Sequence, residues 1–253
     1  MSASDTLPDG FVLHAHERLA STNDEARRLA EAGAPAGTVV TAAEQTKGRG
    51  RHGRSWASPR GNLYASVLLR PDCAMAAATQ LSLVAGLALA EALAQLGPAG
   101  VEPQLKWPND VLLGGAKTAG ILLEGTGDAA GRAVWVIAGT GVNLVSCPDG
   151  LGYPATCLAR EGFAELTPET VLAAYLRELD RWLEQWRAAG FSAVRRAWLA
   201  RGFGLGAEIR LRLAGGELSG RWLDLTDSGS LLVEQAGGRR REIATGDVVY
   251  LDR

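Results

Sequence analysis

Residues 103–126, PQLKWPNDVLLGGAKTAGILLEGT, decide the fold of this chain. Two strand-like runs, 103–108 and 109–113, are followed by a Gly-Gly turn and then by a third run over 117–126. A further apolar strand, RAVWVIAGTGVNL (132–144), ends among glycines. Parallel neighbours need crossover connections of a dozen or more residues, and the connections here are shorter. The spacing therefore favours an antiparallel or mixed sheet over a doubly wound parallel one.

The segments around this region predict flanking helices and additional strands. Ser21-Thr22-Asn23-Asp24 has the S-x-x-D pattern of a helix N-cap with an acid in the first turn, and Gly33 ends that helix. Thr167 and Pro168 are a typical cap and first residue of a second helix. We expect strands over 11–19, 38–45 and 62–70, and helices over 77–96, 167–190 and 191–200.

Residues 77–96 are apolar enough to suggest a membrane span, but Gln80, Glu91 and Gln95 would be unfavourable in a bilayer. We therefore expect a buried core helix and no membrane partner. The polar N-terminus, MSASDTLPDG (1–10), predicts no signal peptide. Three cysteines without metal-ligand spacing are typical of a reduced protein, and we expect a cytoplasmic one.

The pattern changes after the Gly-rich stretch RGFGLGA (201–207) to short strands separated by turns. This change predicts two domains, a larger one over residues 1–203 and a small β-barrel over 204–253. The predicted fold class is α+β, a mixed β-sheet with flanking helices plus the small C-terminal barrel.

Local charge is more informative than net charge in this sequence. The formal net charge of −2 gives no general attraction to nucleic acid or anionic lipid, so any anion binding must be local. The densest basic cluster outside the tail run 239–241 is Arg49, Arg51 and Arg54. Of 26 basic residues only three are lysine, and all stand in Gly- or Pro-containing segments: Lys47, Lys106 and Lys117. We expect these positions to need a compact ammonium.

The basic loop KGRGRHGRSW (47–56) matches two phosphate-binding patterns, G-x-G-x-x-G and a P-loop with arginine in place of lysine. Both patterns require a helix directly after the loop, because the helix N-terminus supplies much of the anion site. Pro59 and Gly61 prevent such a helix, so we interpret both matches as false. Three glycines and three mutually repelling arginines predict a segment that is mobile until it closes over a phosphate-containing ligand.

Four other short motifs carry polar groups suited to chemistry. Together they supply donors for a carboxylate and a phosphate, an aromatic face for a base, and one acid. We interpret Trp107 within them as a packing residue. The motifs are STN (21–23), KWPND (106–110), KTAGIL (117–122) and GTGVN (139–143).

These motifs, the third extended to KTAGILLE (117–124), and EQTKGRGRHGRSW (44–56) resemble the biotin–protein ligases (biotin–acetyl-CoA-carboxylase ligases) in order and approximate spacing. The resemblance extends from about residue 12 to the end of the chain. It implies a class II synthetase-like catalytic domain and an SH3-like C-terminal barrel. It also implies that biotin and Mg-ATP form biotinyl-5′-AMP, and that biotin is then transferred to a lysine of a carboxylase carrier domain.

The resemblance further implies a role for each site residue. Arg51 should span the biotin carboxylate and the phosphate, Lys117 should contact the carboxyl oxygen, and Asp110 should orient or deprotonate the acceptor lysine; these three are the predicted catalytic residues. We assign no metal ligand to the side chains, and Mg²⁺ is expected with ATP. The expected biotin ligands are Ser21, Thr22, Asn23, Gln45, Gly48, Arg49, Arg51, Lys117, Gly120 and Gly139. The expected ATP ligands are Arg51, Arg54, Trp56, Lys106, Asn109 and Asn143, with Trp56 as the platform for adenine.

Two features depart from the family pattern. His52 stands where many members carry another arginine or a small residue, which would make the loop charge mildly pH-dependent. Only residues 1–20 precede the first motif, too few for the winged-helix DNA-binding domain of some members. We therefore expect an enzyme that does not bind DNA, and we leave monomer and homodimer both open.

Two other interpretations fit parts of the sequence. A lipoate–protein ligase or octanoyl transferase shares the general fold and the carrier lysine. The transferase needs a cysteine nucleophile, however, and Cys73, Cys147 and Cys157 lie outside the motifs. A nucleic-acid-binding module could use the basic loop and the barrel, but the net charge of −2 speaks against it.

Overall fold

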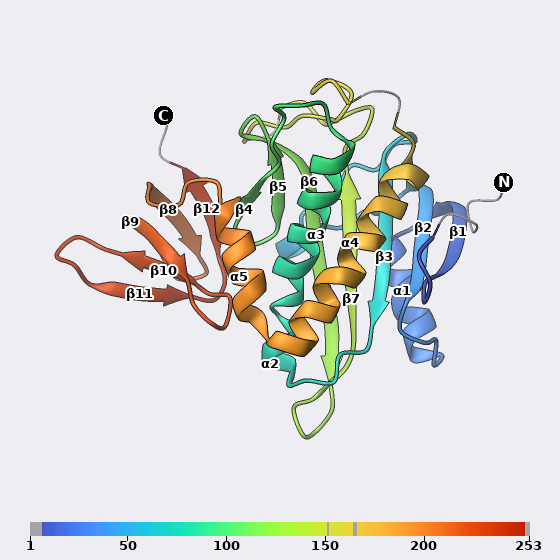
Figure 1. Cartoon of the computed structure of the whole chain (residues 1–253), viewed down its shortest axis with the longest axis horizontal. Helices are drawn as coiled ribbons and strands as arrows, with labels where there is room; N and C mark the ends of the chain where they lie inside the picture. The colour runs from blue at the N-terminus through green and yellow to red at the C-terminus, as the bar shows by residue number, and fades with distance from the viewer. Residues whose placement is uncertain (1–6, 151, 164–165, 251–253) are drawn as a thin grey trace.

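A seven-stranded mixed β-sheet forms the centre of the molecule (Figure 1). The structure, a computed structural model, describes residues 7–150, 152–163 and 166–250. The strand order is β1-β2-β3-β7-β6-β5-β4; among these described strands β1 and β2 pair in parallel and the other neighbours pair antiparallel. The prediction of a mixed sheet is confirmed. The strands are β1 (Val12–Leu19), β2 (Thr38–Gln45), β3 (Leu63–Leu69), β4 (Gln104–Lys106), β5 (Asp110–Leu113), β6 (Ala116–Gly127) and β7 (Ala133–Val142).

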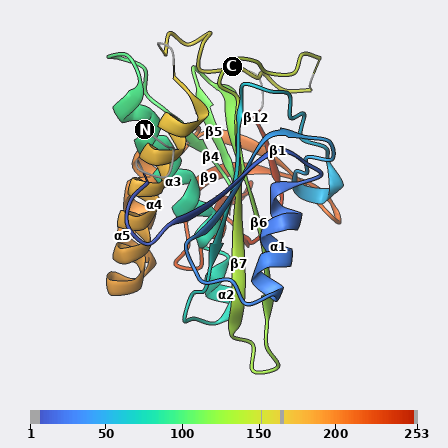
Figure 2. The same ribbon diagram turned by 90° about the vertical axis from the view of Figure 1, so that its right-hand side faces the viewer.

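Helices cover both faces of the large sheet (Figure 2). On one face α1 (Thr22–Glu31) packs against β2, β3 and β7. The other face carries the remaining helices, and the predicted start of the longest is confirmed, because the Thr167 hydroxyl accepts a hydrogen bond from the Thr170 N–H (3.2 Å). These helices are α2 (Met75–Ala78), α3 (Leu81–Leu96), α4 (Pro168–Ala189) and α5 (Phe191–Ala200).

The apolar helix α3 is a core helix, as its sequence predicts. The stretch Met75–Leu96 is long and apolar enough to cross a membrane, yet 67% of its apolar window is buried inside the fold. Its polar residues bind the neighbouring helix α4: Glu91 pairs with Arg181, and the Gln95 amide donates to Glu178 (2.7 Å). Each polar group that counted against a bilayer location thus has a partner in the protein.

The N-terminus of α1 differs from the S-x-x-D expectation. Ser21 takes the N-cap position, but within the described chain its side chain makes no capping hydrogen bond. The Gln45 side chain instead accepts from the backbone N–H of Thr22 (2.8 Å). The parallel register of β1 and β2 places Leu19 opposite Gln45, so the end of β2 lies beside the start of α1. A strand that is distant in sequence therefore supplies the cap.

A second sheet of five antiparallel strands follows α5, in the order β11-β10-β9-β8-β12. Its buried side chains belong to the same continuous apolar core as α3, α4 and α5. The predicted combination of a mixed sheet with a small C-terminal β-structure is confirmed. The strands are β8 (Glu208–Leu213), β9 (Gly216–Leu225), β10 (Leu231–Glu234), β11 (Arg240–Ile243) and β12 (Asp247–Tyr250).

The small sheet is fixed against the β4 end of the large sheet (Figure 1). The Trp107 indole is 2% exposed and donates its N–H to the Gly229 carbonyl in the β9–β10 turn (3.1 Å), so its predicted packing role is confirmed. From α5, Trp198 meets Trp222 edge to face with ring centroids 5.9 Å apart. Buried aromatic contacts of this size hold the small sheet in a defined position relative to the KWPND segment.

Candidate active site

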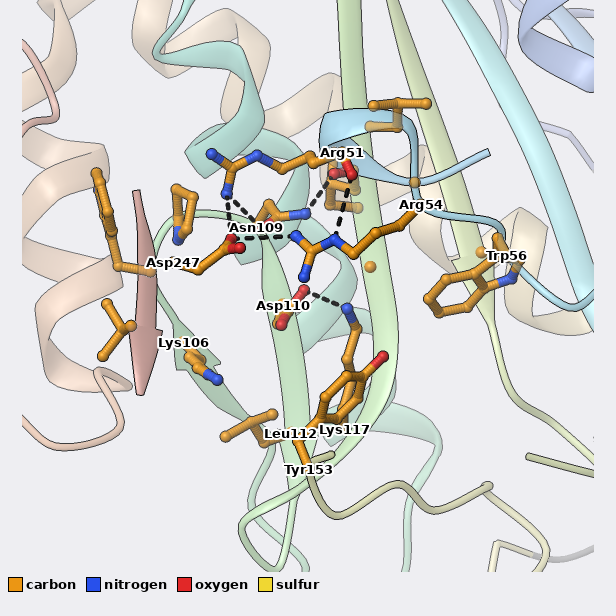
Figure 3. A pocket seen from close by; sticks show the side chains of 18 of the residues that line it. Arg51, Arg54, Trp56, Lys106, Asn109, Asp110, Leu112, Lys117, Tyr153 and Asp247 are labelled. Atoms are coloured by element: carbon orange, nitrogen blue, oxygen red, sulfur yellow. Dashed lines mark hydrogen bonds and ion pairs between the residues drawn. The ribbon is translucent and has the colours of Figure 1, made fainter. Parts of the chain in front are cut away.

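A cavity of about 850 Å³ opens on the α1 side of the large sheet, beyond the N-terminal end of α1. We call it the central cavity (Figure 3). Its walls come from α1, β2, β6, β7, the basic loop, the KWPND segment and β12. Of the sixteen predicted site residues the structure brings fourteen to this wall: Ser21, Thr22, Asn23, Gln45, Arg49, Arg51, Arg54, Trp56, Lys106, Asn109, Asp110, Lys117, Gly120 and Gly139.

Glycines in β7 make room for the cavity. Side chains alternate between the faces of a strand, so Trp135, Ile137, Gly139 and Gly141 all face the α1 side. Trp135 and Ile137 pack with α1. The two glycines continue this row beyond the helix, and a Cβ at Gly139 would lie 2.1 Å from Oδ1 of Asn23. Gly139 is therefore needed for the close approach of Asn23 as well as for a flat cavity wall.

A neutral polar network lies at the N-terminus of α1. The Gln45 carbonyl oxygen accepts from the hydroxyl of Thr22 (3.1 Å), and the Gln45 amide donates to Ser58 (3.0 Å). Ser66 Oγ lies 2.8 Å from Thr22 Oγ1 and 2.6 Å from Asn23 Oδ1. Ser66 was not predicted as a site residue. The available signal was a single polar residue in the otherwise apolar and fully buried strand β3, since buried polar groups need partners.

Glu124, a carboxylate to which no role was assigned from the sequence, holds one side of this network. Arg49 donates to both of its oxygens (2.8 Å each), and the amide of Asn23 donates to Oε2 (2.7 Å). Burial alone would raise the pKa of Glu124, but the hydrogen bonds from Arg49 and Asn23 outweigh it and lower the pKa. Glu124 is four residues after Gly120 on the same face of β6, so strand periodicity was the signal that could have identified it.

An ammonium group lies at the centre of the cavity wall (Figure 3). Lys117 Nζ is 2.6 Å from Oδ1 of Asp110 and lies 5.3 Å and 5.5 Å from the ring centroids of Trp56 and Tyr153. The Trp56 indole rests on Gly141, where a Cβ would lie 2.6 Å from the ring. Its Nε1 is buried and has no hydrogen-bond partner among the described residues. Tyr153 was not predicted, and no local motif marks it.

The backbone of the basic loop does not form a helix-capped phosphate site. A 3-10 turn, Arg51–Gly53, is closed by an antiparallel bridge between Arg49 and Ser55, and the next regular element is β3. His52 has a φ of 55°, in the left-handed region that few residues other than glycine adopt. The interpretation of both phosphate patterns as false matches is confirmed.

The side chains of the loop differ from the expectation of mutually repelling, unpaired arginines. Arg51 donates to Asn109 Oδ1 (3.2 Å) and to the carbonyl of Gly246 (3.3 Å). Arg54 pairs with Asp247 (3.1 Å), and Arg49 pairs with the carboxylate of β6 described above. Burial lowers the pKa of Arg51, although an arginine remains charged at neutral pH. Carboxylates and carbonyls of the protein therefore offset the repulsion within the loop.

The remaining predicted residues lie around this centre. Lys106 is on the cavity wall, and burial lowers the pKa of its ammonium. Asn143 lies instead on an adjoining cavity of about 110 Å³, where its amide donates to the Thr156 carbonyl (3.1 Å). Gly48 is not on either wall within the described chain. A Cβ there would be 2.4 Å from Ser58 Oγ, so Gly48 allows the loop to pass close to its own base.

The central cavity has two chemical halves. Hydroxyls and amides line the α1 end, where the charges of Arg49 and Glu124 are paired with each other, whereas the guanidinium of Arg51 and the ammonium of Lys117 lie in the middle. Such an arrangement suits a ligand with a polar uncharged head and an anionic tail that meets a second anion. Among the described residues no group of three or more His, Cys, Asp or Glu side chains is placed to hold a metal ion.

Comparisons with known proteins agree on one family. Residues 7–200 match the Biotin/lipoate A/B protein ligase family, and residues 204–250 match the Biotin protein ligase C terminal domain. The chain is 42% identical to the biotin–[acetyl-CoA-carboxylase] ligase of Paracoccus denitrificans, over 88% of this chain and 94% of that protein. It is 38% identical to the ligase of the same name from Mycobacterium tuberculosis, over 91% and 86%.

Solved structures of biotin protein ligases are also similar to this chain. The structure of the biotin protein ligase from Aquifex aeolicus in complex with biotin and ATP superimposes with a TM-score of 0.79 at 31% sequence identity. That alignment covers 94% of this chain and 97% of the other.

The paired Glu124 carboxylate predicts a pH-dependent stability. At neutral pH we expect Glu124→Gln to lower the free energy of unfolding by about 1–3 kcal/mol, because the charge-assisted hydrogen bonds from Arg49 are lost. The pKa of Glu124 is lowered from 4.5 by folding, so its contribution is present above pH 4.5 and is lost as the pH falls through the folded-state value. Urea unfolding of both proteins as a function of pH measures this. A difference that stays constant into acid would contradict it, and Glu31→Gln on the exposed side of α1 is the control.

Proposed function

The chain belongs to the biotin/lipoate A/B protein ligase family and is an ATP-dependent biotin–protein ligase, and we propose that the central cavity is where it activates and transfers biotin. The main support for this proposal is that the two halves of the cavity are continuous with each other. Asn23 at the neutral end and Lys117 and Arg51 in the cationic middle line one continuous wall. We further propose that residues 1–203 form the catalytic domain and residues 204–253 a small SH3-like C-terminal barrel.

We assign the neutral end of the cavity to the biotin ring. A ureido group has both donors and acceptors, and the hydroxyls of Ser21 and Thr22 with the amide of Gln45 offer the matching partners. The network behind Thr22 holds these groups in place before the ligand binds, which reduces the entropy that binding must overcome. The other biotin ligands in this assignment are Asn23, Gly48, Arg49, Gly120 and Gly139.

The first reaction is proposed to occur in the cationic middle. The biotin carboxylate attacks the α-phosphate of ATP, a phosphorus–oxygen bond forms, and pyrophosphate leaves. Two anions must approach each other, so Arg51 and Lys117 are assigned to offset their repulsion and the charge of the transition state. Mg²⁺ enters as the partner of the ATP phosphates, which is its usual mode of binding.

The nucleotide is assigned to the side of the cavity that Trp56 borders. The indole offers a face for adenine and an unpartnered N–H, and Asn143 lines the adjoining cavity. Arg54, Lys106 and Asn109 complete this assignment, since all three lie on the central cavity wall.

The second reaction transfers biotin from the adenylate to a lysine amine. The amine attacks the carbonyl carbon, an amide forms, AMP leaves, and the amine loses a proton. Asp110 lies 2.6 Å from Lys117 and is assigned to orient the incoming ammonium or accept its proton. We propose the carrier domain of a carboxylase as the protein that supplies this lysine, as the names of the relatives indicate.

A related transferase with a cysteine nucleophile is a poorer match. Cys73, Cys147 and Cys157 are free cysteines, and none lies on the wall of either cavity in the described chain.

Free cysteines and a requirement for ATP also support our proposal that the protein acts in the cytoplasm.

Incubation of a carboxylase carrier domain with biotin and Mg-ATP tests the function directly. We expect mass spectrometry to detect a biotin-dependent adduct on one lysine of the carrier. An adduct that forms with lipoate but not with biotin would contradict the assignment.

Lys117→Ala tests the proposed site. We expect adenylate formation to slow by about 100-fold or more, because a positioned charge at the reacting group is removed. The matched control is Lys47→Ala, since Lys47 is an exposed lysine in the described chain that lies on neither cavity wall. Pyrophosphate exchange measures both. Full activity of Lys117→Ala would exclude the role assigned to this lysine.

A further inference from the structure

The turn between β11 and β12 of the small sheet reaches the basic loop across the central cavity. It presents the hydroxyl of Thr245, the carbonyl of Gly246 and the carboxylate of Asp247. Asp247 and its neighbour Val248 both line the cavity. None of the sequence motifs includes this turn, and its residues have no part in the assignments made above.

Two arginine side chains of the loop, Arg51 and Arg54, converge on this turn (Figure 3). Arg54 Nη2 lies 3.1 Å from Asp247 Oδ1, and Arg51 Nη1 lies 3.6 Å from the same oxygen. Arg51 also donates to the Gly246 carbonyl (3.3 Å) and the Thr245 hydroxyl (3.5 Å). The planar fork of Arg51 is thus directed toward the small sheet by three successive residues.

Charge explains why the contact needs a carboxylate. Arg51 and Arg54 are close enough to repel each other, and the Arg51 side chain is only 17% exposed, so water screens it weakly. Burial and Arg54 lower the pKa of Arg51, and Asp247 opposes both effects. One shared carboxylate therefore allows two guanidinium groups to lie side by side over the cavity.

The position of Asp247 is set by the small sheet rather than by the loop. Asp247 is the first residue of β12, which pairs with β8 in a regular register that places it opposite Arg212. The next residue, Val248, is 4% exposed and belongs to the main core. The small sheet is in turn held by the Trp107 indole and by α5. Because the small sheet is fixed in this way, the Asp247 carboxylate has a defined position at which it can hold side chains of the glycine-containing loop.

We propose that Asp247 is a positioning residue: its carboxylate holds Arg51 and Arg54 over the central cavity and so makes the small C-terminal sheet part of the active site. The catalytic consequence rests on the function proposed above. When Asp247 holds Arg51, the guanidinium is in place for the reacting phosphate and the loop shields the adenylate from water. Without the carboxylate, the loop opens and both effects are weakened.

Limited trypsin digestion of the ligand-free protein tests the contact without any need for activity. Trypsin cleaves after arginine, and local opening controls the rate of cleavage. We expect Asp247→Asn to be cut between residues 49 and 54 about 5-fold faster than wild type. Glu234→Gln is the matched control, because Glu234 is also a 33% exposed carboxylate of the small sheet but pairs with Arg240. A wild-type cleavage rate in Asp247→Asn would overturn the proposal.

Kinetics then separate positioning from a merely structural role. We expect Asp247→Asn to lower kcat for adenylate formation about 10-fold and to release more adenylate into solution, while the Kd for biotin changes less than about 3-fold. Asp247→Glu should regain most of the lost kcat because it restores the charge. If Asp247→Glu is as impaired as Asp247→Asn, or if neither changes kcat, the proposal is wrong.

The proposal can still be tested if Asp247→Asn does not fold or if the wild-type protein transfers no biotin. If Asp247→Asn does not fold, Arg54→Gln removes the outer partner of the same pair from a 55% exposed position and should speed cleavage after Arg49 and Arg51, the two loop arginines that remain. Wild-type cleavage in Arg54→Gln would then overturn the proposal. If wild type transfers no biotin, the proposed function fails, and the digestion experiment still decides whether Asp247 holds the loop.

Discussion

The central cavity depends on positions where the large sheet carries no side chain. The apolar faces of the large sheet are covered by helices, and α1 covers one face only as far as Trp135 and Ile137. The same row then continues as Gly139 and Gly141, and Gly120 stands beside them on β6. Because these glycines leave space next to the N-terminus of α1, a cavity forms where a packed core would otherwise continue. The groups that line it come from both sheets and from the loop between β2 and β3.

The cations over this cavity are held by the protein's own acceptors. Glu124 binds Arg49, Asp110 binds Lys117, and Asp247 lies between two arginines of the loop. A side chain that is oriented before the substrate arrives does not have to be ordered during the reaction, which is the basis of electrostatic preorganisation. The basic loop therefore combines a glycine-containing backbone with side chains that have fixed partners. This combination suits a loop that must admit two substrates and then exclude water.

Much of the fold and the centre of the site could be predicted from local sequence. Lys117 and Gly139 stand in short motifs whose chemistry is visible, and strand spacing alone indicated an antiparallel or mixed sheet rather than a parallel one. The missed features depend on contacts between distant segments. Ser66 acts through α1, and Asp247 meets the loop across 193 residues of sequence, as the separation from Arg54 shows. Ser21 stands at the predicted N-cap position, but its side chain makes no capping hydrogen bond among the described residues, and Gln45 from β2 accepts from the Thr22 N–H instead. Periodicity identifies the face on which a residue lies, but it does not identify the residue opposite.

The central claim is that a side-chain-free wall beside Asn23 forms the biotin pocket. Calorimetric titration of biotin into wild type and Gly139→Ala tests it most directly, because the added methyl would lie 2.1 Å from Asn23 Oδ1 and would displace that side chain. The account predicts that Gly139→Ala raises the Kd for biotin about 10-fold or more, because the displaced Asn23 side chain no longer holds the polar groups of the pocket in position for the ligand. An unchanged Kd in a correctly folded variant would contradict it.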